Sequence, residues 1–462
     1  MFKKVIVKGT DIKYISTNLN ARPVLFREAL LRGLAPDGGL YLPSSVPLLN
    51  SDEMESLMGM EYPELASKIV GKFTGDDISS GELESICREV YSFSLPVEHV
   101  KGSSYILRLD RGPTASFKDF AALLMGRLMQ HFLSRENRNI IILTATSGDT
   151  GSAVANAFAG LGNIRVIILY PAGEVSDLQR KQMTTFDDNI SVIEIGGKFD
   201  DCQKLVKKAF MDESLSVYNL SSANSINIGR LLPQSVYYFK AWAELAKGIA
   251  DKIVFSVPCG NFGNVAGGLI AARMGLPVRK FVIATNENNE VPEFLSVGKY
   301  EPIAPSKNCI SSAMNVGHPS NLARIVSMYG GIMDEHGRIT KAPDLNRMRK
   351  ELFAISVSDE MTRASMKQFY HDYGKLLEPH GAVAWHGLSE YLKTIENTEN
   401  EGIINVSLET AHPAKFREEI RSLLNVDPVI PDSLKTIEFK KEEYISLENN
   451  YHLLKDYITK NY

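Results

Sequence analysis

A lysine beside a glycine–proline turn is the residue of this chain best placed for covalent chemistry. Gly112 and Pro113 mark a tight turn. Ser116 stands three residues before Asp119, the spacing of a capping box at a helix start. Lys118 therefore falls in the first helical turn, where the positive end of the helix dipole disfavours an ammonium group. The free amine that results is the form of lysine that forms Schiff bases with carbonyl compounds.

The helix face that carries Lys118 is apolar, because Ala121, Ala122 and Met125 follow it at helical spacing. Burial against that face disfavours the charged amine further. The alternative is a surface lysine whose stem lies along the helix while its head reaches water.

Two short turns place hydroxyl, amide and glycine residues between an expected strand and an expected helix. The first, residues 146–151, ends the β-branched strand 140–146, and the second, residues 259–264, follows the strand 253–257. Backbone N–H groups converge at such helix starts and attract anions. Two glycines three positions apart let the second turn approach a small phosphate, although their spacing fits neither common nucleotide-binding glycine motif. The simpler alternatives are an N-cap cluster and an ordinary strand-to-helix turn.

Two other polar segments could also hold a ligand. Asn224, Ser225 and Arg230 belong to a run of amides and hydroxyls that could clamp an oxyanion or a phosphate. Thr410 ends the expected strand 402–408, where its hydroxyl could hydrogen-bond a ring nitrogen. Taken alone, the two segments also suit a polar loop with a surface arginine and a strand-end threonine.

Alternating strands and helices beyond residue 100 predict an α/β protein with a parallel, doubly wound sheet. Such sheets bind ligands at the carboxyl ends of their strands, where the turns described above lie. Residues 286–345 are less regular and could cover the site or form an inserted subregion. The expected strands are 140–146, 165–170, 191–195, 253–257, 278–285 and 402–408, and the expected helices include 61–73, 81–91, 200–212 and 358–371.

The composition is that of a multidomain enzyme-sized protein. The chain has 462 residues, too many for one core, and its net charge of −4 argues against a nucleic-acid footprint. No apolar run reaches membrane length, and the N-terminal apolar run is too short for a signal peptide. Four scattered cysteines and nine dispersed histidines fit no metal motif, so no metal site is predicted and a reduced, cytoplasmic location is expected.

An amine-poised lysine, a cup for a small phosphate and a second anion clamp together suit pyridoxal 5'-phosphate and a phosphorylated substrate. The motifs that carry these residues resemble those of threonine synthases, in the family's order. They are Thr114-Ala-Ser-Phe-Lys-Asp-Phe120, Leu143-Thr-Ala-Thr-Ser-Gly-Asp-Thr-Gly151, Ser222-Ala-Asn-Ser-Ile-Asn227, Val257-Pro-Cys-Gly-Asn-Phe-Gly-Asn264 and Thr410-Ala-His-Pro-Ala-Lys-Phe416. The segment Pro36-Asp-Gly-Gly-Leu-Tyr-Leu-Pro43 is similar to the N-terminal domain of the longer bacterial and fungal branch.

The resemblance implies fold type II of the pyridoxal-phosphate enzymes, with two doubly wound α/β domains and an N-terminal domain. The expected division is an N-terminal domain over 1–95, a large cofactor domain over 96–130 and 236–425, a small domain over 131–235, and a peripheral tail over 426–462. The implied reaction converts O-phospho-L-homoserine and water to L-threonine and phosphate. A monomer and a homodimer both remain open.

The resemblance also assigns roles by motif position. Lys118 would hold the cofactor as a Schiff base and serve as the catalytic base. The other cofactor-binding residues would be Asp149, Gly260, Asn261, Phe262, Gly263, Asn264 and Thr410. The substrate-binding residues would be Thr146, Ser147, Thr150, Asn224, Ser225 and Arg230.

Three positions depart from the family pattern. Asn264 stands where many relatives carry Asp, Cys259 where Ser or Thr is common, and Glu409 where a small residue is usual. A dehydratase or phospho-lyase of the same fold is the nearest alternative function, and a cofactor-free scaffold is the second. Product identification with phosphohomoserine distinguishes the first alternative from a threonine synthase. The yellow colour of bound cofactor distinguishes the second, since a cofactor-free scaffold would be colourless.

Overall fold

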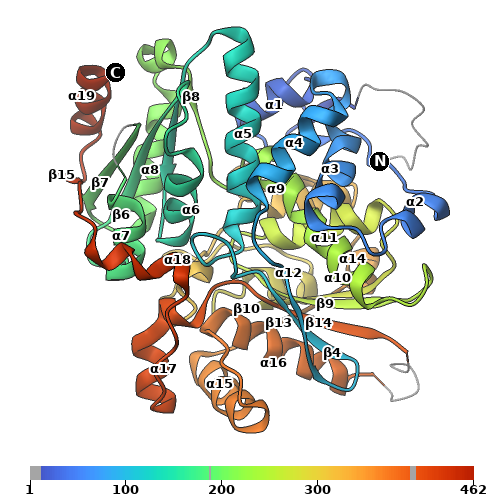
Figure 1. The fold of residues 1–462 in the computed structure, drawn as a ribbon. Helices are drawn as coiled ribbons and strands as arrows, with labels where there is room; N and C mark the ends of the chain where they lie inside the picture. Colours follow the sequence, from blue (N-terminus) through green and yellow to red (C-terminus); the bar gives the residue numbers. More distant parts are fainter. Residues whose placement is uncertain (1–11, 187–188, 396–401) are drawn as a thin grey trace.

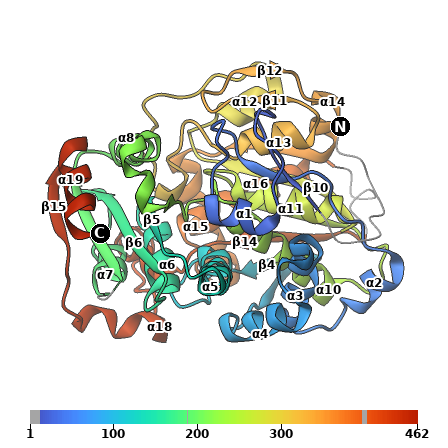
Figure 2. The same ribbon diagram turned by 90° about the horizontal axis from the view of Figure 1, so that it is seen from above.

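The computed structural model describes residues 12–186, 189–395 and 402–462, so the first eleven residues of the expected N-terminal domain lie outside it. Two separate, largely parallel sheets and an N-terminal group of helices form most of the fold (Figures 1 and 2). The expected α/β architecture with two doubly wound units is therefore confirmed.

The N-terminal group packs four helices beside a small antiparallel strand pair. Its third helix buries Tyr62, Leu65, Ile69 and Phe73, which recur at helical spacing and face the core. The helices predicted over 61–73 and 81–91 are present with shifted ends. The elements are β1 (Tyr14–Ser16), α1 (Phe26–Arg32), β2 (Tyr41–Pro43), α2 (Ser51–Ser56), α3 (Tyr62–Thr74) and α4 (Ser80–Val90).

The larger sheet has six strands in the order β13-β10-β9-β14-β4-β3. All neighbours pair in parallel except β3 and β4, which form an antiparallel hairpin at one edge. The strands are β3 (Val97–Lys101), β4 (Ser104–Arg108), β9 (Ile253–Pro258), β10 (Val278–Thr285), β13 (Leu352–Ser356) and β14 (Ile404–Glu409). The helices that accompany it are α10 (Val236–Leu245), α11 (Gly263–Arg273), α12 (Glu290–Val297), α14 (Leu345–Glu351), α15 (Asp359–Tyr373), α16 (Pro379–Lys393) and α17 (Arg417–Leu424).

The smaller sheet has five parallel strands in the order β15-β7-β6-β5-β8. Its outer strand β15 comes from the segment 426–462, for which the sequence predicts only a peripheral tail. Its elements are β5 (Ile140–Ala145), α6 (Asp149–Phe158), β6 (Ile164–Pro171), α7 (Asp177–Thr184), β7 (Ile190–Gly196), α8 (Phe199–Met211), β8 (Leu220–Ser221), α18 (Asp432–Lys435), β15 (Ile445–Glu448) and α19 (Tyr451–Asn461). The short helix α9 (Ile228–Leu231) follows β8 and packs against α5 and α11.

Apolar residues on both faces explain why these strands are central. In β5, Ile140 and Ile142 join the main core, whereas Ile141 and Leu143 join a second core with residues of α8 and α19. Successive side chains of a strand point to opposite faces, so a continuous apolar run fills both layers.

The long helix α5 (Lys118–Glu136) stands between the N-terminal helices and the smaller sheet (Figure 1). It contacts α1 and α4 on one side and α6 on the other. Its first residue is Lys118, which confirms the predicted place of that lysine in the first helical turn.

A less regular segment lies between β10 and β13 of the larger sheet. Residues 286–345 contain α12, the helix α13 (Leu322–Met328) and the hairpin of β11 (Ile332–Met333) and β12 (Ile339–Lys341).

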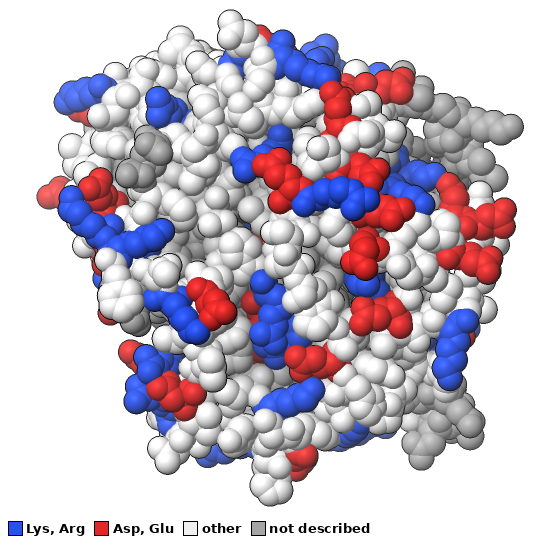
Figure 3. All heavy atoms as spheres, in the orientation of Figure 1, with Lys and Arg blue, Asp and Glu red and all other residues white. Residues whose placement is uncertain are grey.

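The surface carries mixed charge. On the face drawn in Figure 3, acidic and basic side chains lie interspersed. Within the described residues, no helix is long and apolar enough to cross a membrane.

Candidate active site

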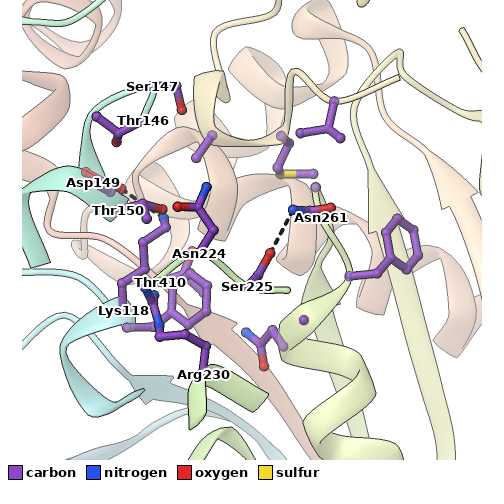
Figure 4. A pocket seen from close by; sticks show the side chains of 18 of the residues that line it. Lys118, Thr146, Ser147, Asp149, Thr150, Asn224, Ser225, Arg230, Asn261 and Thr410 are labelled. Atoms are coloured by element: carbon purple, nitrogen blue, oxygen red, sulfur yellow. Dashed lines mark hydrogen bonds and ion pairs between the residues drawn. The ribbon is translucent and has the colours of Figure 1, made fainter. Parts of the chain in front are cut away.

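One cavity brings together all fourteen residues that the sequence assigns to the site (Figure 4). The turns after β5, β8, β9 and β14 meet there, so the carboxyl ends of strands from both sheets face one another across it. These residues are Lys118, Thr146, Ser147, Asp149, Thr150, Asn224, Ser225, Arg230, Gly260, Asn261, Phe262, Gly263, Asn264 and Thr410.

Lys118 enters the cavity from the start of α5. Its Nζ lies 3.5 Å from Oδ2 of Asp149 and 4.8 Å from the ring centre of Phe117. Burial lowers the pKa of the Lys118 ammonium, the charge of Asp149 opposes that shift, and the cations Lys415 and Arg230 add to it. The site thus makes the Lys118 ammonium lose its proton more readily than an exposed lysine does.

The predicted capping box at this helix is wrong. The N-cap residue is Phe117, and the hydroxyl of Ser116 has no hydrogen-bond partner among the described residues. The carboxylate of Asp119 instead accepts from the backbone N–H of Thr114 at 2.9 Å and from its hydroxyl at 2.5 Å. A carboxylate that folds back on the preceding turn therefore replaces the cap.

The turn between β5 and α6 is tied together by its first threonine. The hydroxyl oxygen of Thr146 accepts from the N–H groups of Gly148 at 3.0 Å and Gly151 at 2.7 Å. Gly148 has a φ of +130°, and a Cβ there would lie 2.6 Å from the side chain of Gln179. Gln179 in turn donates to Oδ1 of Asp149 at 2.9 Å, which fixes the carboxylate at the edge of the cavity.

The turn between β9 and α11 contains only uncharged residues. Gly260 lies so close to the opposite backbone that a Cβ would be 2.6 Å from the carbonyl oxygen of Ala313. Asn261 donates to the hydroxyl of Ser225 at 2.7 Å and accepts from the N–H of Ser320 at 2.7 Å. The turn is therefore rigid, and the start of α11 opens towards the cavity.

Buried donors without partners surround this turn. Asn264 accepts at Oδ1 from the hydroxyls of Tyr237 and Tyr238, both at 2.6 Å, but its Nδ2 has no partner among the described residues. Arg230 donates to the carbonyl oxygen of Ala223 at 2.6 Å, while its buried Nε is likewise unpartnered within the described chain. Burial lowers the pKa of Arg230 to about 10, which leaves it a cation at neutral pH. Unsatisfied donors at a cavity indicate an anionic or polar ligand.

Thr410 and Glu409 at the end of β14 face different surroundings. Thr410 lines the cavity, and its carbonyl oxygen accepts from the N–H of Phe117 at 2.9 Å. The side chain of Glu409 packs against Gly381 and accepts from the N–H of Glu378 at 3.0 Å. Burial and the nearby Glu378 hold the pKa of Glu409 well above its ordinary value. Glu409 thus belongs to the layer behind the site, because neighbouring residues of a strand point to opposite faces.

Sequence reasoning missed several lining residues. His380 accepts at Nε2 from the N–H of Ala313 at 3.1 Å, and its Nδ1 lies 2.5 Å from Oε2 of Glu378. A lone histidine in a helix start gave no signal, and residues 313–316 lie in the stretch without a periodic pattern. The other missed lining residues are Phe117, Ala145, Phe199, Gln203, Gln234, Pro258, Ala313, Met314 and Val316.

Comparisons with known proteins agree with this geometry. Residues 89–404 match the model of pyridoxal-phosphate dependent enzymes, residues 13–91 match the threonine synthase N terminus, and residues 383–458 match the threonine synthase C-terminal model. The threonine synthase of Escherichia coli is 40% identical over 412 residues, which cover 89% of this chain and 91% of that protein. The chain belongs to the threonine synthase family.

Solved threonine synthases share the whole fold. The pyridoxal-phosphate-bound threonine synthase of Brucella melitensis superposes with a TM-score of 0.89 at 34% identity, covering 97% of this chain and 99% of that one. The yeast threonine synthase gives a TM-score of 0.88 at 31% identity, covering 98% and 99%. The chain is therefore a fold type II, pyridoxal-phosphate-dependent enzyme, as the sequence motifs predict.

The residues of the cavity fit this cofactor of the threonine synthase family. The 259–264 turn offers a helix start, a close backbone approach at Gly260 and a buried free donor on Asn264, but no carboxylate that would repel a phosphate. The amine of Lys118 supplies the group that reacts with an aldehyde. Among the described residues, no cluster of three His, Cys, Asp or Glu side chains could hold a metal ion.

Proposed function

We propose that this chain converts O-phospho-L-homoserine and water to L-threonine and phosphate. One observation carries the proposal: a buried lysine with a lowered pKa lies in one cavity with two separate groups of free anion donors. One group is the neutral turn at the start of α11, and the other centres on the unpartnered Nε of Arg230. Two such groups suit one cofactor phosphate and one substrate phosphate.

The cofactor residues form the first part of the proposal. When bound, pyridoxal 5'-phosphate supplies the electron sink for the charge that develops at Cα of the substrate. Lys118 would hold it covalently, Asp149 would lie beside its phenolic oxygen, and Thr410 would face its pyridine nitrogen. Its phosphate would be held by the turn residues Gly260, Asn261, Phe262, Gly263 and Asn264.

The substrate residues form the second part. The turn that contains Thr146, Ser147 and Thr150 would bind the amino-acid portion of the substrate, since hydroxyls and N–H groups meet there at a helix start. Asn224, Ser225 and Arg230 would bind its phosphate. A buried guanidinium is well suited to the charge that collects on this leaving group.

The chain's own residues would then carry the proton and the leaving group. The amine of Lys118, released when substrate binds, takes the proton from Cα. A second proton leaves Cβ, and phosphate departs from Cγ against Arg230. Protonation at Cγ, addition of water at Cβ and return of a proton to Cα give threonine, so one water is consumed for each phosphate released.

The wider assignments belong to the same proposal. The expected domain division is 1–95, 96–130 with 236–425, 131–235 and 426–462, and strand β15 attaches the last segment to the small sheet. A cytoplasmic location and a monomeric or homodimeric state complete it.

Product identification tests the function. The holoenzyme is supplied separately with phosphohomoserine, L-threonine and L-serine, and threonine, phosphate and 2-oxo acids are quantified. Equal amounts of threonine and phosphate from phosphohomoserine are expected. Formation of a 2-oxo acid alone would reassign the chain to the dehydratases of this fold.

A matched pair of arginine variants locates the substrate phosphate. Arg230→Met should keep the visible cofactor band but lose about 100-fold or more in kcat/KM for phosphohomoserine. Arg88→Met removes an exposed arginine of α4 and should leave both properties unchanged. Equal kinetics of the two variants would remove Arg230 from the substrate site.

A further inference from the structure

A single buried carboxylate lies between two lysines at the edge of the cavity. Asp149 is 3.5 Å from Nζ of Lys118 and 2.7 Å from Nζ of Lys415. The second lysine comes from the short helix η6 (Pro413–Phe416), which begins three residues after Thr410, and its side chain has no exposed surface. The function proposed above gives Lys415 no role.

The two lysines share Asp149 unequally. Lys415 has two partners at hydrogen-bond distance, since it also donates to the carbonyl oxygen of Thr114 at 3.0 Å. Oδ1 of Asp149, which it contacts, also accepts from Gln179 at 2.9 Å. Among the described residues, the one polar partner of the Lys118 amine is Oδ2 of Asp149, at 3.5 Å. The carboxylate is therefore held firmly by Lys415 and only loosely by Lys118.

The charges that surround Lys118 favour loss of its proton. Asp149 on α6 faces it, and so do the cations Arg230 of α9 and Lys415 of η6. His380 of α16 lines the same cavity. Beyond these, Lys415 faces Asp119 of α5 and His412, the residue before η6. Asp149 pairs closely with Lys415 and only weakly with Lys118, and the cation with the weakest pairing deprotonates most readily.

We propose that Lys415 is a positioning residue, which engages Asp149 and thereby keeps the Lys118 amine only weakly paired and available. Without Lys415, the buried carboxylate would turn to Lys118 as its nearest cation and hold it as an ammonium. An available Lys118 amine is needed to bind the cofactor, which follows from the family. It is also needed to remove the Cα proton, which rests on the proposed function.

The simpler alternative is that Lys415 is a structural staple, a side chain that only holds two segments together. Its bond to the carbonyl oxygen of Thr114 links η6 to the turn before α5. A staple would affect thermal stability but not the proton affinity of Lys118. The two roles therefore differ in a measurable pH dependence.

The test is a spectrophotometric pH titration of the holoenzyme, in which the visible band of bound cofactor reports protonation of the Lys118 nitrogen. Lys415→Met should raise the midpoint by about one pH unit or more, because it removes a cation and frees a carboxylate. Lys415→Arg keeps the cation and should stay within about 0.3 units. The pH profile of borohydride-trappable cofactor uptake should move in the same direction.

A double variant separates the two roles. Lys415→Met with Asp149→Asn removes both charges and should bring the midpoint back towards that of the unaltered enzyme. Asp149→Asn alone should lower the midpoint, and this holds even if Lys415→Met fails to fold. An unchanged midpoint in Asp149→Asn, or in a folded Lys415→Met, would overturn the proposal. If the proposed substrate is wrong, product identification will show it, but the titration midpoints expected for these variants will be unaffected. Failure of the proposed function and failure of the proposed role of Lys415 are therefore distinguishable.

Discussion

The turns 146–151 and 259–264 are built alike but charged differently. Each follows a buried parallel strand, each begins a helix, and Figure 4 shows Asp149 and Asn261 on opposite sides of one cavity. The first turn carries the carboxylate of Asp149, held by two lysines and Gln179. The second turn carries only amides, glycines, a cysteine and a phenylalanine.

The difference shows that helix geometry alone does not decide which ligand a strand-end turn accepts. Both helix starts present the same positive dipole end. A phosphate at the second turn meets only neutral groups, whereas one at the first would meet Asp149, whose pKa is lowered because Lys415 and Lys118 outweigh its burial. The fixed side-chain charge therefore favours the second turn as the place of the cofactor phosphate, as the proposed function has it.

Replacing the lysine between the turns should have the largest effect. Lys118→Arg keeps a cation at the start of α5, but a guanidinium neither forms a stable imine nor takes a proton at neutral pH. Threonine formation should fall by about 1,000-fold or more. Borohydride should then trap no adduct, while the neutral turn still binds the cofactor phosphate without a covalent bond.

The control is Lys393→Arg, which changes an exposed lysine of α16 and should preserve turnover and the trapped adduct. Substantial turnover in Lys118→Arg would show that Lys118 is not the catalytic residue, and the two turns would then not serve a common reaction centre.

A glycine pair in the second turn tests its close backbone approach. A Cβ on Gly260 would lie 2.6 Å from the carbonyl oxygen of Ala313, whereas one on Gly263 would meet nothing nearer than 3.5 Å. Gly260→Ala should weaken cofactor affinity by about 10-fold or more, because overpacking displaces the turn. Gly263→Ala should change it less than about 3-fold. Cofactor titration followed by visible absorbance measures both, and equal losses would contradict a cup defined at Gly260.

Two aspartates at helix starts sharpen the comparison through opposite pKa shifts. Asp119, near the start of α5, is fully buried, and burial raises its pKa from 3.8 to about 6, although the bonds from Thr114 and the charge of Lys415 act in the opposite direction. A raised acid pKa gives stability that is complete below the unfolded value and lost as the pH rises through about 6. Asp149 has the opposite sign, because its stabilisation is present above the unfolded pKa and lost only as the pH falls.

The free energy of unfolding should accordingly decrease by about 1 to 2 kcal/mol through Asp119 between pH 5 and pH 8. Urea unfolding of the chain and of Asp119→Asn at both pH values measures it. The difference between the two proteins should depend on pH, and a constant difference would mean that Asp119 is ionised throughout.

Much of the site could be predicted because its residues lie at strand ends. Strands such as β5 and β9 are continuous apolar runs, and the polar residues after them must meet where parallel strands end. Contacts that depend on distant partners could not be predicted. His380 meets Ala313 across 67 positions, and β15 is a short, mostly exposed strand that gains its place only by pairing with β7.

The smallest effect is expected at the residue where local pattern and tertiary structure disagree. Ser116 has the spacing of a cap, and a real cap would cost about 1 kcal/mol when removed. Its hydroxyl has no partner among the described residues, since Asp119 bonds Thr114 and the N–H of Phe117 donates to Thr410. Ser116→Ala should therefore change the urea midpoint very little, whereas Thr146→Val, which removes an acceptor of two N–H groups in the charged turn, should lower it clearly. A comparable loss in Ser116→Ala would show that Ser116 does cap α5. A side-chain hydroxyl would then stabilise the start of α5, as Thr146 does at the start of α6.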